Sequence, residues 1–319
     1  MTAGVAAGAP QAGEAGRPDG RRRLKLVLAY DGTGLRGFAA QPGQRTVAGE
    51  LSGAIERVAG HPVRLVCAGR TDAGVHAFGQ VVHVDVDARV DPVRLQRSCN
   101  GLLSPAIVVR AAEVAPCGFD ARRQALSRRY RYQVLNAPAP DPFLSGVAWH
   151  VPEPLDLRGM QAATDPLLGE HDFSVFCRRP KLPREAGGPE PGGPGAAGPG
   201  VSGPAEAPKA SLVRRVLEAS WSEDSPNVWW PVGEGPGGTP AGVPSCGRLL
   251  RFSVEANAFC HQMVRSMVGM LVAVGRGQLR AGEVGALVRS GDRGLAPSPA
   301  PPHGLCLWGV RYGPDGNHP

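Results

Sequence analysis

The sequence predicts an α+β fold built on ferredoxin-like units. Short apolar runs with strand periodicity alternate with amphipathic segments of helical periodicity. Over residues 24–114 they follow the order strand–helix–strand–strand–helix–strand, which is the order of a ferredoxin-like unit. The chain has 319 residues, a length typical of about two domains.

The elements of the first half are defined by periodicity and by end signals. The first strand, 24–30, places alternate apolar side chains on one face. Thr46 can cap the first helix and Gly60 can end it. Asp91 and Pro92 together mark the start of a second helix. The elements expected after the first strand are helix 46–58, strands 63–66 and 81–87, helix 92–103 and strand 107–114.

A glycine pattern follows the first strand. Gly32-Thr33-Gly34-Leu35-Arg36-Gly37 has the G-x-G-x-x-G spacing of dinucleotide-binding folds. In those folds the last glycine opens a helix, and an acidic residue ends the next strand about 20 residues on. Here the chain continues as a loop to 46, and the next strand ends without an acid. The pattern favours a glycine-rich loop over nicotinamide binding.

Residues 67–77 join two predicted strands and carry the strongest chemical signal. Gly69 and Gly74 let the backbone turn tightly and approach a ligand closely. Arg70 lies two residues before Asp72, and a carboxylate can act as nucleophile or as general acid or base. The same spacing fits a plain hairpin connection with one surface ion pair, which contributes about 0–1 kcal/mol. Spacing alone leaves both interpretations open.

The second half begins near residue 119 with a strand over 128–135 that alternates tyrosines and arginines. The further elements expected are helix 156–168, a hairpin of strands 212–221 and 249–255, a buried helix 259–274, a short helix 281–290 and a final strand 305–312. Arg265 falls within the buried helix and needs a partner there, because an unpaired buried charge is very costly.

Three segments lack the composition of a folded core. Residues 1–23 are rich in alanine and glycine and are expected to form a disordered tail, not a signal peptide. Segment 180–210 contains eight prolines and eight glycines, and 231–247 is similar in character. Such segments bury too little apolar surface to become ordered. The expected organisation is an N-terminal domain at 24–117 and a C-terminal domain at 118–319 with two flexible insertions.

The charge favours a nucleic-acid partner. The formal net charge is +7, and of 35 basic residues only Lys25, Lys181 and Lys209 are lysines. Arginine binds phosphate bidentately, although arginine together with abundant Ala, Gly and Pro is also typical of a GC-rich genome. The alternating tyrosines and arginines of 129–132 add support, because aromatic rings stack on unpaired bases.

Other function classes find little support. The seven cysteines are scattered and include no C-x-x-C, which argues against a disulfide framework and for a reducing cytosol. No apolar run reaches the roughly 18 residues of a membrane span. His76, His83 and the pair Cys260-His261 fit no zinc spacing, so no metal is expected. No phosphate-binding loop with a Gly-Lys-Ser/Thr ending occurs, so nucleotide hydrolysis is not expected either.

Residues 68–77 have the sequence Ala-Gly-Arg-Thr-Asp-Ala-Gly-Val-His-Ala. This stretch resembles the signature of the tRNA pseudouridine synthase A (TruA) family, whose members modify the anticodon arm of tRNA. Five further regions resemble family motifs in the same order: Tyr30-Asp31-Gly32-Thr33 with Gly37-Phe38, Gly79 to His83, Phe119 to Arg122 with Arg129 to Tyr132, Gly169 to Ser174, and Ala256 to Arg265. The resemblance covers about 24–312. Departures are Phe38 in place of the usual Trp, Gln262 in place of a frequent second His, and the two insertions.

The resemblance implies a fold and an activity. The family fold is two ferredoxin-like (RRM-like) halves that share an extended antiparallel sheet with helices on one face and a basic cleft. The implied activity is isomerisation of uridine to pseudouridine at positions 38, 39 and 40 of the tRNA anticodon stem and loop. It implies a cytoplasmic homodimer that uses no metal, no nucleotide and no other cofactor.

The resemblance also implies site residues. Asp72 matches the catalytic aspartate, which attacks the uracil ring or ribose C1′ of a flipped-out uridine. Arg70 is expected to pair with Asp72 and to fill the space left by the flipped base, and Tyr130 to stack on the uracil. The remaining expected members of the pocket wall are Arg265, Phe259 and Leu305.

Two other functional hypotheses remain compatible with the sequence. One is a non-catalytic RNA-binding protein on the same scaffold, although such a protein has no use for the Asp72 carboxylate, which repels phosphate. The other is a nicotinamide-dependent oxidoreductase, which rests on the 32–37 glycine pattern alone.

Overall fold

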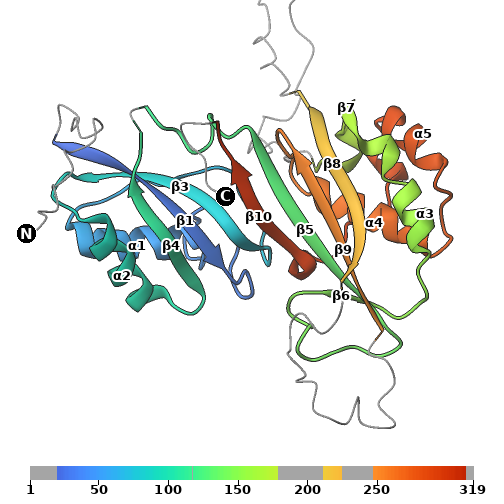
Figure 1. Cartoon of the computed structure of the whole chain (residues 1–319), viewed down its shortest axis with the longest axis horizontal. Coiled ribbons are helices and arrows are strands. Elements are labelled where there is room, and N and C mark those ends of the chain that lie inside the picture. The colour runs from blue at the N-terminus through green and yellow to red at the C-terminus, as the bar shows by residue number, and fades with distance from the viewer. Residues whose placement is uncertain (1–19, 117, 179–210, 225–246, 314–319) are drawn as a thin grey trace, which may run out of the picture.

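The computed structural model describes residues 20–116, 118–178, 211–224 and 247–313. The first half contains four strands and two helices of this described part (Figure 1). They are β1 (Arg21–Tyr30), α1 (Val47–Ala59), β2 (Val66–Cys67), β3 (His76–Asp87), α2 (Pro92–Leu103) and β4 (Ile107–Val114). The predicted order of elements is confirmed, and α1 and α2 pack against each other beside β4.

The second half repeats the alternation of strands and helices. Its elements are β5 (Ser127–Asn136), β6 (Trp149–Val151), α3 (Leu157–Ala162), β7 (Gly169–Asp172), β8 (Val213–Asp224), β9 (Arg248–Ala256), α4 (Met263–Gly275), α5 (Glu283–Ser290) and β10 (Leu305–Arg311). β8 and β9 pair antiparallel, so the predicted hairpin is confirmed. The first expected insertion, 180–210, and nearly all of the second, 231–247, lie outside the described residues, as does the tail up to 19.

One continuous sheet runs through both halves, in the order β4-β1-β3-β10-β5-β9-β8-β7 (Figure 1). The last strand of the chain, β10, joins them, because it lies between β3 and β5. It pairs parallel to β3 through Cys306 and His76, and antiparallel to β5 through Leu307 and Tyr130. The α+β class is confirmed. The sheet is mixed and not purely antiparallel, because β6 also runs parallel to β5.

The predicted end signals operate as expected in the first half. The Thr46 hydroxyl accepts a hydrogen bond from the Gly49 amide at the start of α1, and Gly60 ends that helix in the left-handed conformation. Asp91 caps α2 by accepting from the Arg94 amide. These contacts satisfy amide groups that a helix end leaves without partners.

Several expected elements differ in extent. β1 begins at Arg21, so the tail expected to reach 23 is shorter, and β3 begins at His76 instead of 81. The helix expected from 259 begins at Met263, because Gln262 adopts a left-handed backbone with φ 66°. The helix expected over 156–168 ends at Ala162 and is followed by a 3₁₀ turn, Asp165–Leu167, that contains Pro166; proline cannot donate the hydrogen bond that a continuing α-helix needs. The strand expected over 63–66 is reduced to β2.

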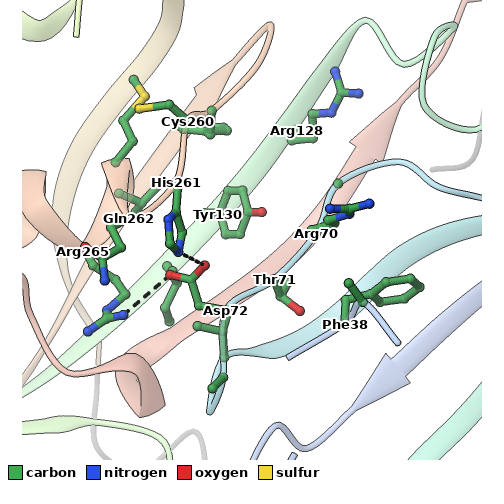
Figure 2. Close-up of a pocket in the computed structure, with 18 of the residues that line it drawn as sticks. Phe38, Arg70, Thr71, Asp72, Arg128, Tyr130, Cys260, His261, Gln262 and Arg265 are labelled. Atoms are coloured by element: carbon green, nitrogen blue, oxygen red, sulfur yellow. Dashed lines mark hydrogen bonds and ion pairs between the residues drawn. The ribbon is translucent and has the colours of Figure 1, made fainter. Parts of the chain in front are cut away.

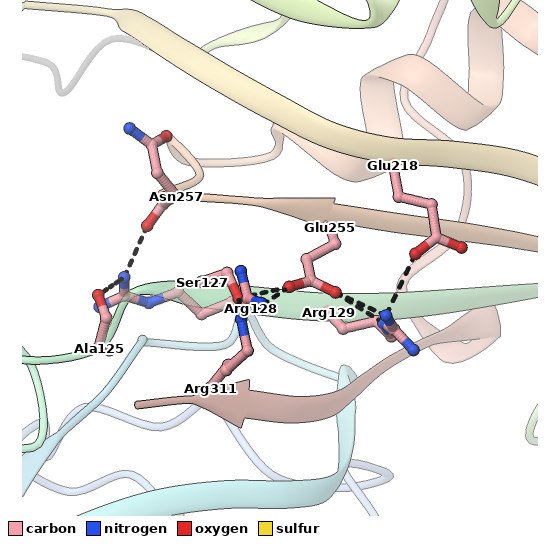
Figure 3. A network of polar contacts seen from close by, with 8 residues as sticks. All are labelled: Ala125, Ser127, Arg128, Arg129, Glu218, Glu255, Asn257 and Arg311. Atoms are coloured by element: carbon pink, nitrogen blue, oxygen red, sulfur yellow. Dashed lines mark hydrogen bonds and ion pairs between the residues drawn. The ribbon is translucent and has the colours of Figure 1, made fainter. Parts of the chain in front are cut away.

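A network of polar and charged side chains links β5 to its neighbouring strands β9 and β10 (Figure 3). Glu255 of β9 accepts hydrogen bonds from Ser127 and Arg129 of β5 and contacts Arg311 of β10. Burial by itself would raise the pKa of Glu255, but the hydrogen bonds from Ser127 and Arg129 outweigh it and lower the pKa below its usual range. The network therefore fixes the strand that carries Tyr130.

In the part of the chain that the structure describes, no helix is long and apolar enough to cross a bilayer.

Candidate active site

A cavity of about 640 Å³ opens where the 67–77 loop meets β5, β10 and the segment before α4 (Figure 2). Its walls contain all six side chains that the sequence singled out: Arg70, Asp72, Tyr130, Phe259, Arg265 and Leu305. They come from positions up to 235 residues apart (70 to 305), so the fold, not the local sequence, brings them together.

The loop that carries Asp72 is held by buried hydrogen bonds on both sides. The Thr71 carbonyl accepts from the Phe38 amide at 3.1 Å, and the Thr71 hydroxyl lies 2.8 Å from the Tyr30 hydroxyl. Gln80 of β3, which is fully buried, donates to the Gly69 carbonyl at 2.7 Å. The loop is therefore a rigid support for the carboxylate.

The glycine pattern of 32–37 has a structural use here. A Cβ atom at Gly37 would lie 2.8 Å from the Thr71 carbonyl oxygen, and one at Gly32 would collide with the Val75 carbonyl. Glycine is needed because two backbone segments approach this closely. The chain after Gly37 reaches α1 only at Val47. The pattern thus supports the Asp72 loop and does not open a helix as a dinucleotide motif would.

Asp72 has two neighbours from the second half of the chain, a histidine and an arginine. His261 Nε2 lies 3.3 Å from one carboxylate oxygen, and Arg265 Nη1 lies 3.5 Å from the other (Figure 2). The Asp72 side chain is 23% exposed and that of Arg265 is 14% exposed. The carboxylate thus lies at the edge of the cavity, oriented through both oxygens.

Arg70 does not form the expected ion pair. Among the described residues the ion-pair partners of Asp72 are His261 and Arg265, and the Arg70 side chain points away from the carboxylate (Figure 2). Arg70 is exposed at the other end of the same cavity. Its exposed guanidinium is accessible to an incoming ligand.

Arg265 has the partner that its place on a buried helix demands. Its Nε donates to the Ala300 carbonyl at 2.7 Å, and its own carbonyl accepts from the Ala300 amide at 2.9 Å. These bonds fix the guanidinium at the first turn of α4, pointing toward Asp72. The expectation that this charge is compensated is confirmed.

Tyr130 forms the apolar wall of the cavity. It is buried, and its ring meets Phe259 edge to face with centroids 5.0 Å apart. Burial raises the pKa of Tyr130 above its usual value, and the nearby Tyr30 and Asp72 raise it further. The phenol is therefore neutral near pH 7 and presents a flat surface that suits a planar base.

Known proteins match this chain over nearly its whole length. A sequence profile of tRNA pseudouridine synthases matches residues 26–122 and 203–313. A protein of Frankia casuarinae named tRNA pseudouridine synthase A is 42% identical over 301 residues, which cover 93% of this chain and 92% of that protein. The chain belongs to the tRNA pseudouridine synthase family.

Relatives with the same name confirm the assignment. Proteins of Methylobacterium nodulans and Brevibacillus brevis are 38% and 34% identical. Each alignment covers 91% of this chain, and it covers 96% and 100% of the two relatives. The resemblance seen in the sequence motifs is thus confirmed, and the family is one of isomerases.

The site of this pseudouridine synthase family member contains one residue that sequence reasoning missed, His261 in the segment before α4. The sequence offers His261 only as a candidate metal ligand, whereas in the structure it contacts Asp72. Because α4 begins only at Met263, after the left-handed Gln262, helical spacing does not relate His261 to Arg265, and no local pattern showed this contact. Among the residues that the structure describes, no group of three or more His, Cys, Asp or Glu side chains lies close enough to hold a metal.

A disulfide between Cys177 and Cys260 ties this segment to the 3₁₀ turn Ser174–Phe176. The scattered cysteines predict no disulfide framework, and that prediction does not hold for this pair. The spacing could not show it, because the two positions are 83 residues apart. A hydrogen bond from the Arg178 amide to the His261 carbonyl makes a second link beside it. The segment that carries His261 and Phe259 is thereby fixed at its back.

Proposed function

We propose that this chain converts uridine to pseudouridine at positions 38, 39 and 40 in the anticodon stem and loop of tRNA, with Asp72 as the nucleophile. The observation that carries the proposal is the position of Asp72 at the edge of a cavity, between His261 and Arg265 and beside a buried tyrosine. Family membership supplies the reaction and the tRNA substrate.

The reaction exchanges one bond to the ribose for another. The bond from C1′ to N1 of uracil breaks, the base turns, and a bond from C1′ to C5 forms. C5 loses a proton and N1 gains one, so the reaction has no net oxidation or reduction. Asp72 attacks the uracil ring or C1′, and the cavity retains the detached base while it turns. A site shielded from water suits this step, because it keeps the base in place.

The other side chains have roles that their positions support. Tyr130, supported edge to face by Phe259, stacks on the uracil. Arg265 orients the Asp72 carboxylate, and Leu305 closes the cavity behind the base. Arg70, exposed and turned outward, enters the space that the flipped base leaves in the RNA. Arginine suits this role because its planar group both stacks and binds phosphate.

The assembly and the cellular location are part of the same proposal. Residues 24–117 and 118–319 form two ferredoxin-like domains with the RNA cleft between them, and two chains associate as a homodimer. The enzyme works in the cytoplasm, where its tRNA substrate is found. Light scattering of the purified chain, alone and with tRNA, tests the dimer: a molar mass of one chain at micromolar concentration contradicts it.

Mapping of pseudouridine in an unmodified tRNA transcript tests the activity. The purified chain is expected to modify transcripts with uridine at 38, 39 or 40, and a matched transcript with cytidine at those three positions serves as control. Modification confined to other positions contradicts the anticodon assignment. Binding of tRNA without any pseudouridine formation favours the non-catalytic RNA-binding alternative.

A further inference from the structure

A second cavity, of about 390 Å³, opens beside the candidate active site. The two cavities share Phe38, Ala39, Arg70 and Arg122 in their walls, and the second adds Arg64. We call it the arginine pocket, after Arg64, Arg70 and Arg122. Its far wall is formed by α1 and by the segment 63–67 that leads into β2. Its volume is near the lower end of the range of about 300–1,000 Å³ for small-molecule sites, which suits one nucleotide.

The positive charge of the arginine pocket has no acidic partner in the part of the chain that the structure describes. Arg64, Arg70 and Arg122 are all exposed, and within the described ranges none of them forms an ion pair with an acidic side chain. Arg128, in the adjacent cavity, differs: its guanidinium donates to backbone carbonyls, including that of Ala68. Arg128 is therefore used in holding the backbone, whereas the three pocket arginines are available to an anion.

The floor of the pocket is apolar. Val63 and Leu65 pack against the hydrophobic core while part of each stays accessible, and Cys67 is buried below them. Burial raises the pKa of the Cys67 thiol, which outweighs the opposite effect of Arg122 beside it. The thiol therefore stays neutral and does not compensate the arginines. An apolar floor beneath a rim of cations matches a nucleotide, with its flat base and charged phosphate.

The first turn of α1 does not supply the anion site. The amide groups of Val47 and Ala48 donate to the carbonyls of Gly37 and Phe38 at 3.1 and 2.9 Å. A helix N-terminus attracts phosphate through amide groups without partners, and these amides already have partners. Any anion in the pocket therefore depends on the arginine side chains.

We propose that the arginine pocket binds the nucleotide next to the target uridine in the same RNA strand. Arg122 lines both cavities, so it is placed to hold the phosphate that links the two nucleotides, while Arg64 and Leu65 contact the neighbour itself. The inference rests on the proposed function, because it needs a flipped uridine in the first cavity. It assigns to the enzyme a second subsite that follows the RNA backbone away from Asp72.

Substitution of Arg64 and Arg122 by glutamine tests the subsite, with Arg97→Gln as matched control. Arg97 is an exposed arginine of α2 that lines neither cavity. Binding of an unmodified tRNA transcript is measured across a salt series in the Asp72→Ala background, which prevents turnover. We expect R64Q and R122Q each to weaken binding about fivefold to tenfold and to reduce the slope of log affinity against log salt by about 0.7–0.9, as loss of one phosphate contact does.

A phosphate scan then identifies the contact. RNAs are prepared in which one phosphate at a time, on either side of the target uridine, is an uncharged methylphosphonate. At one of these positions the methylphosphonate is expected to weaken wild-type binding and to cause no further loss in R122Q. If the affinity losses from the methylphosphonate and from R122Q are additive at every position, the proposal is overturned. It is also overturned if R64Q and R122Q bind the tRNA as tightly as R97Q does.

Pseudouridine formation by the wild-type chain on the same transcript separates the two claims. Its absence refutes the proposed function. If the wild-type chain forms pseudouridine but R64Q and R122Q bind tRNA as tightly as R97Q does, only the proposed role of the arginine pocket is refuted.

Discussion

Substitution of Gly37 by alanine tests whether the glycine loop holds Asp72 in place. Gly37 has a left-handed backbone with φ +86°, and its added Cβ would lie 2.8 Å from the Thr71 carbonyl oxygen and 3.2 Å from the Asp72 carbonyl carbon. Ordinary contact at these positions begins at 3.4 Å, so the 71–73 backbone must shift by about 0.6 Å. Because both contacts are to backbone atoms, no side-chain rotation can relieve them.

The protein contains a matched control for this change. Gly34 is also left-handed, with φ +74°, but a Cβ there meets no atom within 4 Å. Both alanine variants carry the backbone cost of about 1–2 kcal/mol, and only G37A adds an overpacking cost of about 1–3 kcal/mol. A displacement of about 1 Å in a catalytic group lowers rates by roughly a hundredfold, so G37A is expected to lose about tenfold to a hundredfold in kcat. G34A is expected to stay within about twofold of wild type.

Pseudouridine formation under single-turnover conditions, together with thermal unfolding, checks the prediction. Rates are compared at a temperature where circular dichroism shows both variants folded. Equal rates for G37A and G34A would refute the claim that Gly37 positions the Asp72 loop. A loss in G37A that is fully explained by unfolding would refute it equally.

Two further predictions concern stability. Because the pKa of Glu255 is lowered in the folded state, the stabilisation that its carboxylate provides is present above about pH 4.5 and is lost as the pH falls through the lower folded-state pKa. E255Q is expected to lower the free energy of unfolding by about 1–3 kcal/mol at pH 7. A difference in unfolding free energy between E255Q and wild type that is just as large at pH 3 contradicts this prediction. The Cys177–Cys260 disulfide spans 83 residues and is expected to stabilise the oxidised chain by about 2–4 kcal/mol. C177S is expected to have the same unfolding free energy as the reduced wild type. Peptide mapping that does not recover the linked pair after mild oxidation contradicts the disulfide.

The fold class could be predicted because periodicity and capping are local signals. The first half follows the sequence closely for this reason, and the ends of α1 and α2 are set by Thr46 and Asp91. The position of β10 between the halves had no local signal, because a strand pattern does not identify its pairing partner. The late start of α4 was equally hidden, since it depends on a left-handed Gln262 whose side chain accepts from Arg293.

The site could be predicted as a set of residues but not as a set of contacts. Motifs identified Asp72 and Tyr130, and the structure places both on one cavity. Proximity in sequence suggested Arg70 as the partner of Asp72, whereas the partners in the structure are His261 and Arg265, about 190 residues away. Long-range contacts of this kind come from the packing of α4 against the sheet, which spacing along the chain does not encode.

Asp72→Asn tests the central claim most directly, because it keeps the shape of the side chain and removes its charge and nucleophilicity. Release of tritium from tRNA labelled at uridine C5 is measured with binding of the same tRNA. The account predicts a loss of at least about 10⁴-fold in rate, as for removal of a catalytic nucleophile, with tRNA affinity within about threefold of wild type. Tritium release by the variant within tenfold of the wild-type rate would contradict Asp72 as the nucleophile.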